Sequence, residues 1–164
     1  MLTISMSRVQ QLFAVGAVAA LALFGPPQIV VRAAQAGAAG APAGAVLTIE
    51  GKHHDDFGSL RITGRAESVR AGKRITNPLT LTSTGKGTFA VTRQWESGTP
   101  WVLVFSAEQA DHGNHAIAEA LVKIDSRGAV VDIDHPRASI VAKGMAQRIG
   151  EKEVAAALAT LAPR

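Results

Sequence analysis

The chain has 164 residues, 47% of them hydrophobic and none of them cysteine, with 17 Lys and Arg side chains against 13 Asp and Glu. The lack of cysteine excludes disulfides, thiol catalysis, thiolate metal ligands and a lipidated N-terminal cysteine. Arg8 and Arg32 lie in the first 36 residues, which hold no acid, so the rest of the chain has 15 basic against 13 acidic side chains. This near balance argues against nucleic-acid binding.

The first 36 residues have the features of an export signal. Arg8 is the one charged side chain ahead of an apolar run over 12–24, and Ala34 and Ala36 are small residues that a signal peptidase accepts. The run is shorter than the roughly 20 apolar residues that span a bilayer. We therefore predict a signal peptide over 1–36, cleaved near Ala36, and a bacterial periplasmic or secreted protein that meets the membrane only through this signal. An uncleaved signal anchor is the alternative.

The residues that follow predict a β-sandwich. Small residues over 37–45 indicate a flexible leader, and the fold is expected to start near Val46. Apolar and polar residues then alternate with a period of two. The predicted strands are 46–50, 60–66, 75–82, 88–92, 101–106, 117–124 and 129–133. Seven short strands joined by turns predict a mainly antiparallel, immunoglobulin-like or transthyretin-like sandwich over 46–136, with strand 101–106, apolar on both faces, at its centre.

The last segment, 137–164, is predicted to be a helical extension. Glu151 and Glu153 lie where the first turn of a helix favours acids, and Val154, Leu158 and Leu161 are spaced for one helix face. This pattern predicts a helix over 151–161. Whether that helix extends back through 145–149, and whether 139–141 forms an eighth strand, stays open.

Four segments between residues 60 and 107 follow one another in a familiar order: a strand with a glycine, an apolar strand, a G-x-F stretch, and a turn glycine before an apolar strand. These segments are Ile62–Arg65, Leu79–Leu81, Gly87–Val91 and Ser97–Ser106. The succession resembles the carboxypeptidase-regulatory or transthyretin-like family of β-sandwich modules. The resemblance implies a non-catalytic accessory or binding module and supplies no catalytic residues.

Histidines beside aspartates are the best candidates for chemistry. All five histidines are expected in loops or at strand ends, where imidazole and carboxylate groups can converge on zinc or copper at about 2.0–2.2 Å. The candidate ligands are His53, His54, His112, His115, His135, Asp111 and Asp134. Their spacing alone does not show that they converge, and scattered, solvated loop histidines are the favoured interpretation.

Catalytic interpretations have less support. Ser59, Ser106 and Ser139 lack a G-x-S-x-G elbow, and the acid pairs Asp55–Asp56 and Asp132-x-Asp134 are typical of turns and edge strands. A domain of this size also offers little cleft for a sugar chain. We therefore predict that the chain is not an enzyme and needs no cofactor.

Two features suggest a binding surface. Arg61 and Arg65 share one face of a predicted strand within a basic stretch, which suits an anionic polymer, although a solvated face is the simpler interpretation. Trp95, in a predicted loop, is less constrained than Trp101 and can stack on a sugar ring if it is exposed. The sequence thus predicts an exported, non-catalytic binding or accessory protein with a protein or polysaccharide partner. The alternatives are a periplasmic zinc- or copper-binding protein and a small hydrolase.

Overall fold

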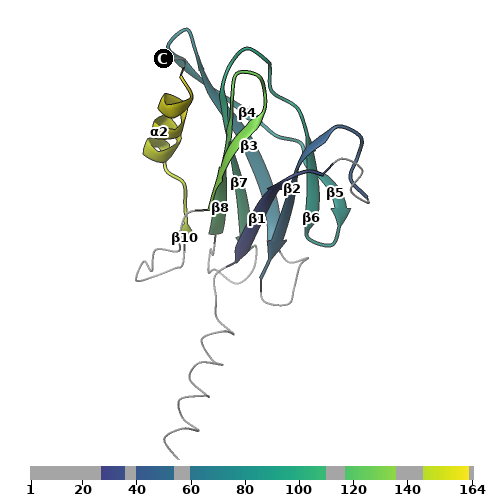
Figure 1. The fold of residues 1–164 in the computed structure, drawn as a ribbon. Helices are drawn as coiled ribbons and strands as arrows, with labels where there is room; N and C mark the ends of the chain where they lie inside the picture. The colour runs from purple at the N-terminus through teal and green to yellow at the C-terminus, as the bar shows by residue number, and fades with distance from the viewer. Residues whose placement is uncertain (1–26, 36–39, 54–59, 110–116, 136–145, 163–164) are drawn as a thin grey trace, which may run out of the picture.

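Two β-sheets pack face to face, and one helix covers part of the outer side of the larger sheet (Figure 1). The computed structural model describes residues 27–35, 40–53, 60–109, 117–135 and 146–162. This architecture confirms the prediction of a mainly β sandwich with a C-terminal helix.

The smaller sheet has four antiparallel strands in the order β1-β2-β6-β5. Their bounds are β1 (Gln28–Ala33), β2 (Ala45–Lys52), β5 (Thr82–Gly85) and β6 (Thr88–Thr92). The larger sheet has the order β10-β8-β7-β3-β4, with β9 also paired to β8. Its strands are β3 (Leu60–Arg70), β4 (Lys73–Pro78), β7 (Trp101–Gln109), β8 (Ile117–Ile124), β9 (Val130–Asp134) and β10 (Ala146–Gln147). The short β10 runs parallel to the first half of β8 and β9 runs antiparallel to the second half, so both occupy the same edge.

Strand β7 is central, as its sequence predicts. It lies between β3 and β8, and its alternate residues face two different cores. Leu103 and Phe105 pack between the two sheets, whereas Val102 and Val104 face the helix on the outer side. A strand with both faces covered needs apolar residues at successive positions, which explains the continuous apolar run.

The fold begins earlier in the chain than the sequence suggests. Strand β1 lies ahead of the expected start near Val46 and pairs antiparallel with β2, Val31 opposite Ile49. Ile29 and Val31 are 6% and 3% exposed and belong to the core between the sheets. The predicted leader is also partly ordered, because Ala45 belongs to β2. Cleavage near Ala36, which stays a prediction, would therefore remove β1.

The segment expected to form one strand over 75–82 instead changes sheets. It provides β4 in the larger sheet and the start of β5 in the smaller sheet, with residues 79–81 crossing between them. Leu79 is buried in the core at this crossing. Together with β1 and β10, this break raises the number of described strands from the seven expected to ten.

The C-terminal helix, α2 (Glu151–Leu161), has the predicted bounds. It does not extend back through 146–147, because those residues form β10, and 139–141 lie outside the described residues. Val154, Ala157 and Leu158 are the buried residues of α2, and they pack with Val102 and Val104 of β7. Among the described residues, no helix is long and apolar enough to cross a membrane.

Candidate functional site

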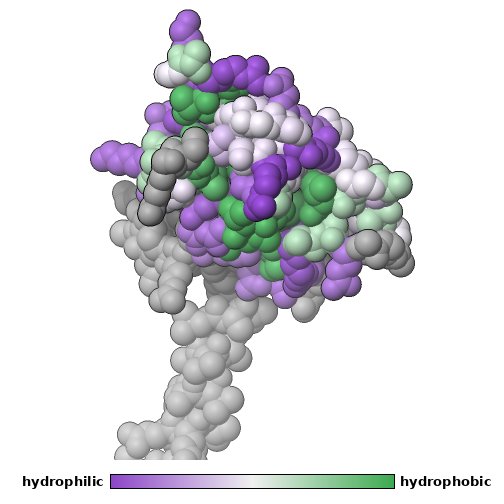
Figure 2. Space-filling model, turned by 45° about the horizontal axis from the view of Figure 1, so that its top comes forward, coloured by the Kyte–Doolittle hydropathy of each residue, from purple (hydrophilic) through white to green (hydrophobic). Residues whose placement is uncertain are grey.

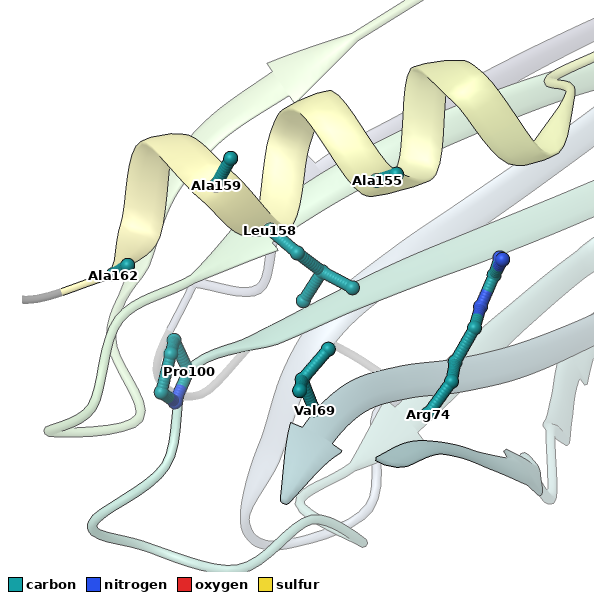
Figure 3. A pocket seen from close by; sticks show the side chains of 7 residues that line it. All are labelled: Val69, Arg74, Pro100, Ala155, Leu158, Ala159 and Ala162. Carbon is teal, nitrogen blue, oxygen red and sulfur yellow. The ribbon is translucent and has the colours of Figure 1, made fainter. Parts of the chain in front are cut away.

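A groove runs between α2 and the outer face of the larger sheet. Its apolar part has a volume of about 460 Å³. The lining residues are Val69, Arg74, Pro100, Ala155, Leu158, Ala159 and Ala162. Figure 3 shows Leu158 of α2 and Val69 of β3 directed into the space between helix and sheet, with Arg74 toward the Ala155 end and Pro100 toward the Ala162 end.

Small side chains keep this groove open. Ala155, Ala159 and the C-cap residue Ala162 are spaced four and three residues apart, so they lie along one side of the helix, and all three are exposed. Val69, at the end of β3, is 48% exposed, which is unusual for a strand valine beside a helix. Figure 2 shows apolar surface in separate patches among hydrophilic side chains at the end of the molecule that carries the β3–β4 turn. The helix thus covers the sheet only in part.

A network of two arginines and one buried glutamate borders the groove. Arg65 Nε donates to Glu67 Oε1 at 2.7 Å, and Arg74 Nε donates to Glu67 Oε2 at 2.5 Å. The Glu67 side chain is only 3% exposed, and two guanidinium groups compensate its buried charge. One carboxylate between two arginines leaves one unit of positive charge. Arg74 Nη1 also lies 3.9 Å from the carboxylate of Glu151, whose side chain is 92% exposed.

A second, polar hollow of about 530 Å³ shares Arg74 with the apolar groove. It lies at the beginning of α2 and is lined by Arg65, Glu67, Arg74, Thr76, Arg148, Ile149, Gly150 and Glu151. The side of α2 that faces β3 therefore has two halves: a polar half with three arginines near the helix N-terminus and an apolar half toward its C-terminus. Arg74 lies where the two halves meet.

Of the residues predicted to form a binding surface, only Arg65 lines the candidate site. Arg65 lies in the site, whereas Arg61 is exposed on the same strand at the register position of Glu108. The expectation that Trp95 is available for a sugar ring is wrong, because Trp95 is 5% exposed and packs in the core with Trp101. The two tryptophans that bracket the turn therefore anchor it to the sandwich.

The predicted metal ligands lie partly outside the described residues, which include His53, Asp134 and His135 but not His54, Asp111, His112 or His115. The strand ends that flank the histidine segments lie at the same end of the sandwich (Figure 1). The described part of the chain contains no group of three or more His, Cys, Asp or Glu placed to hold a metal. His135 Nε2 accepts the Val31 N–H at 3.2 Å, so this imidazole lone pair already stabilises the free side of β1.

Titration of the full chain with zinc or copper tests the metal alternative. Because His135 is engaged with β1 and no three candidate ligands are grouped among the described residues, we expect calorimetry to show no stoichiometric binding. One metal ion bound per chain, lost in a variant carrying His112→Ala and His115→Ala, would contradict this expectation and establish the site.

Two of the described residues considered for catalysis, Ser106 and Asp132, have structural partners. Ser106 Oγ donates to Glu119 Oε1 at 2.7 Å, and the other oxygen of this buried carboxylate accepts the Ile149 N–H. Glu119 thus ties the segment that leads into α2 to strand β8. Lys123 donates to Asp132 at 2.9 Å, and this hydrogen bond lowers the pKa of the Asp132 carboxyl below its usual value. Such a carboxylate stays ionised and is poorly suited to act as a general acid.

Sequence reasoning missed the apolar half of the groove. The helix is predicted from Val154, Leu158 and Leu161 on one face, a pattern that says nothing of its alanines, and Val69 has no unusual neighbours in the sequence. The detectable signal was the spacing of Ala155, Ala159 and Ala162, because a helix that packs closely with a sheet through that side would carry larger apolar residues there.

Comparison with known proteins adds no further constraint on the site. No protein-family model matches the chain, and searches of curated proteins and of solved structures found no significant match. The groove beside α2 is therefore interpreted from its own geometry.

Proposed function

We propose that this chain is an exported, non-catalytic binding protein whose ligand-binding surface is the groove between α2 and β3. The observation that carries the proposal is the open apolar space of about 460 Å³ beside the helix. Small-molecule sites are typically concave, mostly apolar and about 300–1,000 Å³ in volume, with a few polar groups that orient the ligand. The alanine stripe, Val69 and Arg74 supply these properties.

The polar groups around the groove support binding rather than catalysis. Glu67 is held between Arg65 of β3 and Arg74 of β4, and Glu119 is held by Ser106 and by the Ile149 backbone just before α2, so both carboxylates have structural roles. The resemblance of residues 60–107 to carboxypeptidase-regulatory modules points in the same direction. Export is proposed from the apolar, acid-free N-terminal segment, which places the binding protein in the periplasm or outside the cell.

Filling the groove should abolish binding of an apolar probe. N-phenyl-1-naphthylamine fluoresces strongly in apolar surroundings, and we expect the wild-type chain to enhance its emission saturably. Ala159→Phe places an aromatic ring in the groove and should weaken probe binding at least tenfold. Ala156→Phe is the matched control, because Ala156 is also exposed but lines a separate hollow with Lys123 and Asp134. Fluorescence titration measures all three affinities.

Circular dichroism should show that both variants fold, since both alanines are at the helix surface. If the wild-type chain does not bind the probe, or if Ala159→Phe and Ala156→Phe bind it equally well, the groove is not the binding surface and the proposal fails.

A further inference from the structure

We infer that the groove takes a single-chain amphiphile with an anionic headgroup, its alkyl tail lying in the apolar half and its carboxylate at Arg74. This inference rests on the proposed function and adds the chemical class of the ligand and its direction along α2.

The lining of the apolar half specifies an alkyl tail. Apart from Arg74, every side chain that lines it belongs to Val, Pro, Leu or Ala and has no hydrogen-bonding atom. A sugar or a peptide would leave its hydroxyl or amide groups without side-chain partners there, which is costly when those groups lose water. A hydrocarbon chain loses nothing in the same place and gains from leaving water. The space runs along the helix from Ala155 to Ala162, about 10 Å at 1.5 Å per residue.

The charge at one end of this space specifies an anionic headgroup. Arg74 is the one charged residue among those that line the apolar half, and Figure 3 places it at the end toward the start of α2. Its partner Glu67 is shared with Arg65, so the three side chains keep one positive charge, and Arg148 lines the adjoining polar hollow. A planar guanidinium suits a carboxylate because it can donate two parallel hydrogen bonds.

Glu151 occupies the position that such a headgroup would take. Its carboxylate lies 3.9 Å from Arg74 Nη1, beyond hydrogen-bonding distance, and the side chain is almost fully exposed. An exposed ion pair of this kind contributes little, so a ligand carboxylate can displace it. Glu67 cannot be displaced in the same way, because Arg65 also holds it and it is buried. Glu151 should therefore compete with the ligand, and its neutralisation should strengthen binding.

The test compares a fatty acid with the alcohol of the same chain length. Octanoate, decanoate, dodecanoate and dodecan-1-ol are titrated below their aggregation concentrations, and displacement of N-phenyl-1-naphthylamine reports affinity. We expect each added methylene to tighten binding about fourfold until the groove is full. Dodecanoate should bind the wild-type chain at least tenfold more tightly than dodecan-1-ol.

Three variants locate the headgroup. Arg74→Gln should remove the preference for the acid over the alcohol, and Glu151→Gln should tighten dodecanoate binding severalfold without changing the affinity for the alcohol. Arg70→Gln is the matched control. The Arg70 side chain pairs with Glu96 and does not line the groove, so its substitution removes one positive charge but should keep the preference for the acid. Because Glu151 is exposed, its variant gives a readout even if Arg74→Gln unfolds.

The outcomes separate this inference from the proposed function. If the acid and the alcohol bind equally well and Glu151→Gln has no effect, while Ala159→Phe blocks both ligands, the groove is a binding site but the anionic headgroup is wrong. If Ala159→Phe leaves the binding of both ligands unchanged, the groove itself is wrong and both proposals fail.

Discussion

A chain that lacks residues 1–36 is expected to lose most of its stability, whereas a chain that lacks residues 1–26 should fold like the full protein. The longer deletion removes β1, whose Ile29 and Val31 side chains are buried in the core. Each contributes about 1.5–3 kcal/mol by burial, and a whole domain is typically stable by only about 5–15 kcal/mol. The deletion also exposes the edge of β2. Urea unfolding of the two truncated chains measures the difference.

This result bears directly on export. A signal peptidase that cut near Ala36 would release a chain without β1, so we expect the exported, folded protein to begin at or before Gln28. N-terminal sequencing of that protein identifies the cleavage position. Recovery of a stable product that starts at Gly37, or equal stability of the two truncated chains, would show that β1 is dispensable.

Truncation of Phe105 to alanine is expected to destabilise the protein by about 3–5 kcal/mol, because the ring is fully buried at the centre of the larger sheet. Gly64 of the neighbouring strand lies beneath the ring, where a Cβ would be 2.8 Å from two ring carbons. Gly64→Ala should therefore cost about 1–3 kcal/mol in the wild-type chain through overpacking. Free energies of unfolding in urea measure both effects.

The double variant provides the control for this contact. With the ring absent, the new methyl group no longer meets it, so Gly64→Ala should cost much less in the Phe105→Ala background than alone. Additive costs would mean that the glycine is required for another reason. A Phe105→Ala protein as stable as the wild type would contradict the central position of β7.

Much of this fold could be predicted because its strands have one dominant face. The alternation in β2, β3, β6 and β9 and the doubly apolar β7 all indicated strands, and Gly128, with φ at 84°, closes the expected turn between β8 and β9. Strand β1 was missed because Val30, Val31 and Arg32 follow an export-like segment and were assigned to it. The alternation of β1, whose Ile29 and Val31 side chains are buried in the core, was nevertheless present in the sequence.

The candidate site was less predictable because its parts are distant in sequence. Val69, Pro100 and Ala159 come from three elements that meet only after the sandwich has formed. Arg65 was identified from its strand face, but the second partner of the buried Glu67 is Arg74 of the next strand, a contact that forms only when β3 and β4 pair. Trp95 was misjudged because its place in a predicted loop suggested exposure, whereas its side chain is buried in the core. A local sequence pattern predicts which face of a helix or strand is buried, but it does not show which elements pack against that face.

The shared edge of β8 bears on how a chain without cysteine, which we propose to be exported, resists aggregation. Because β10 pairs with the first two residues of β8 and β9 pairs with its last four, a foreign strand finds little of that edge open in the described part of the chain. The other edge strands, β1, β4 and β5, also have features that disfavour pairing with a foreign strand. Lys73, Arg74 and Pro78 lie on β4, β5 has four residues, and the His135 imidazole occupies the Val31 N–H of β1. Such protection resides in strand order and edge chemistry, and it persists in an oxidising or a reducing compartment alike.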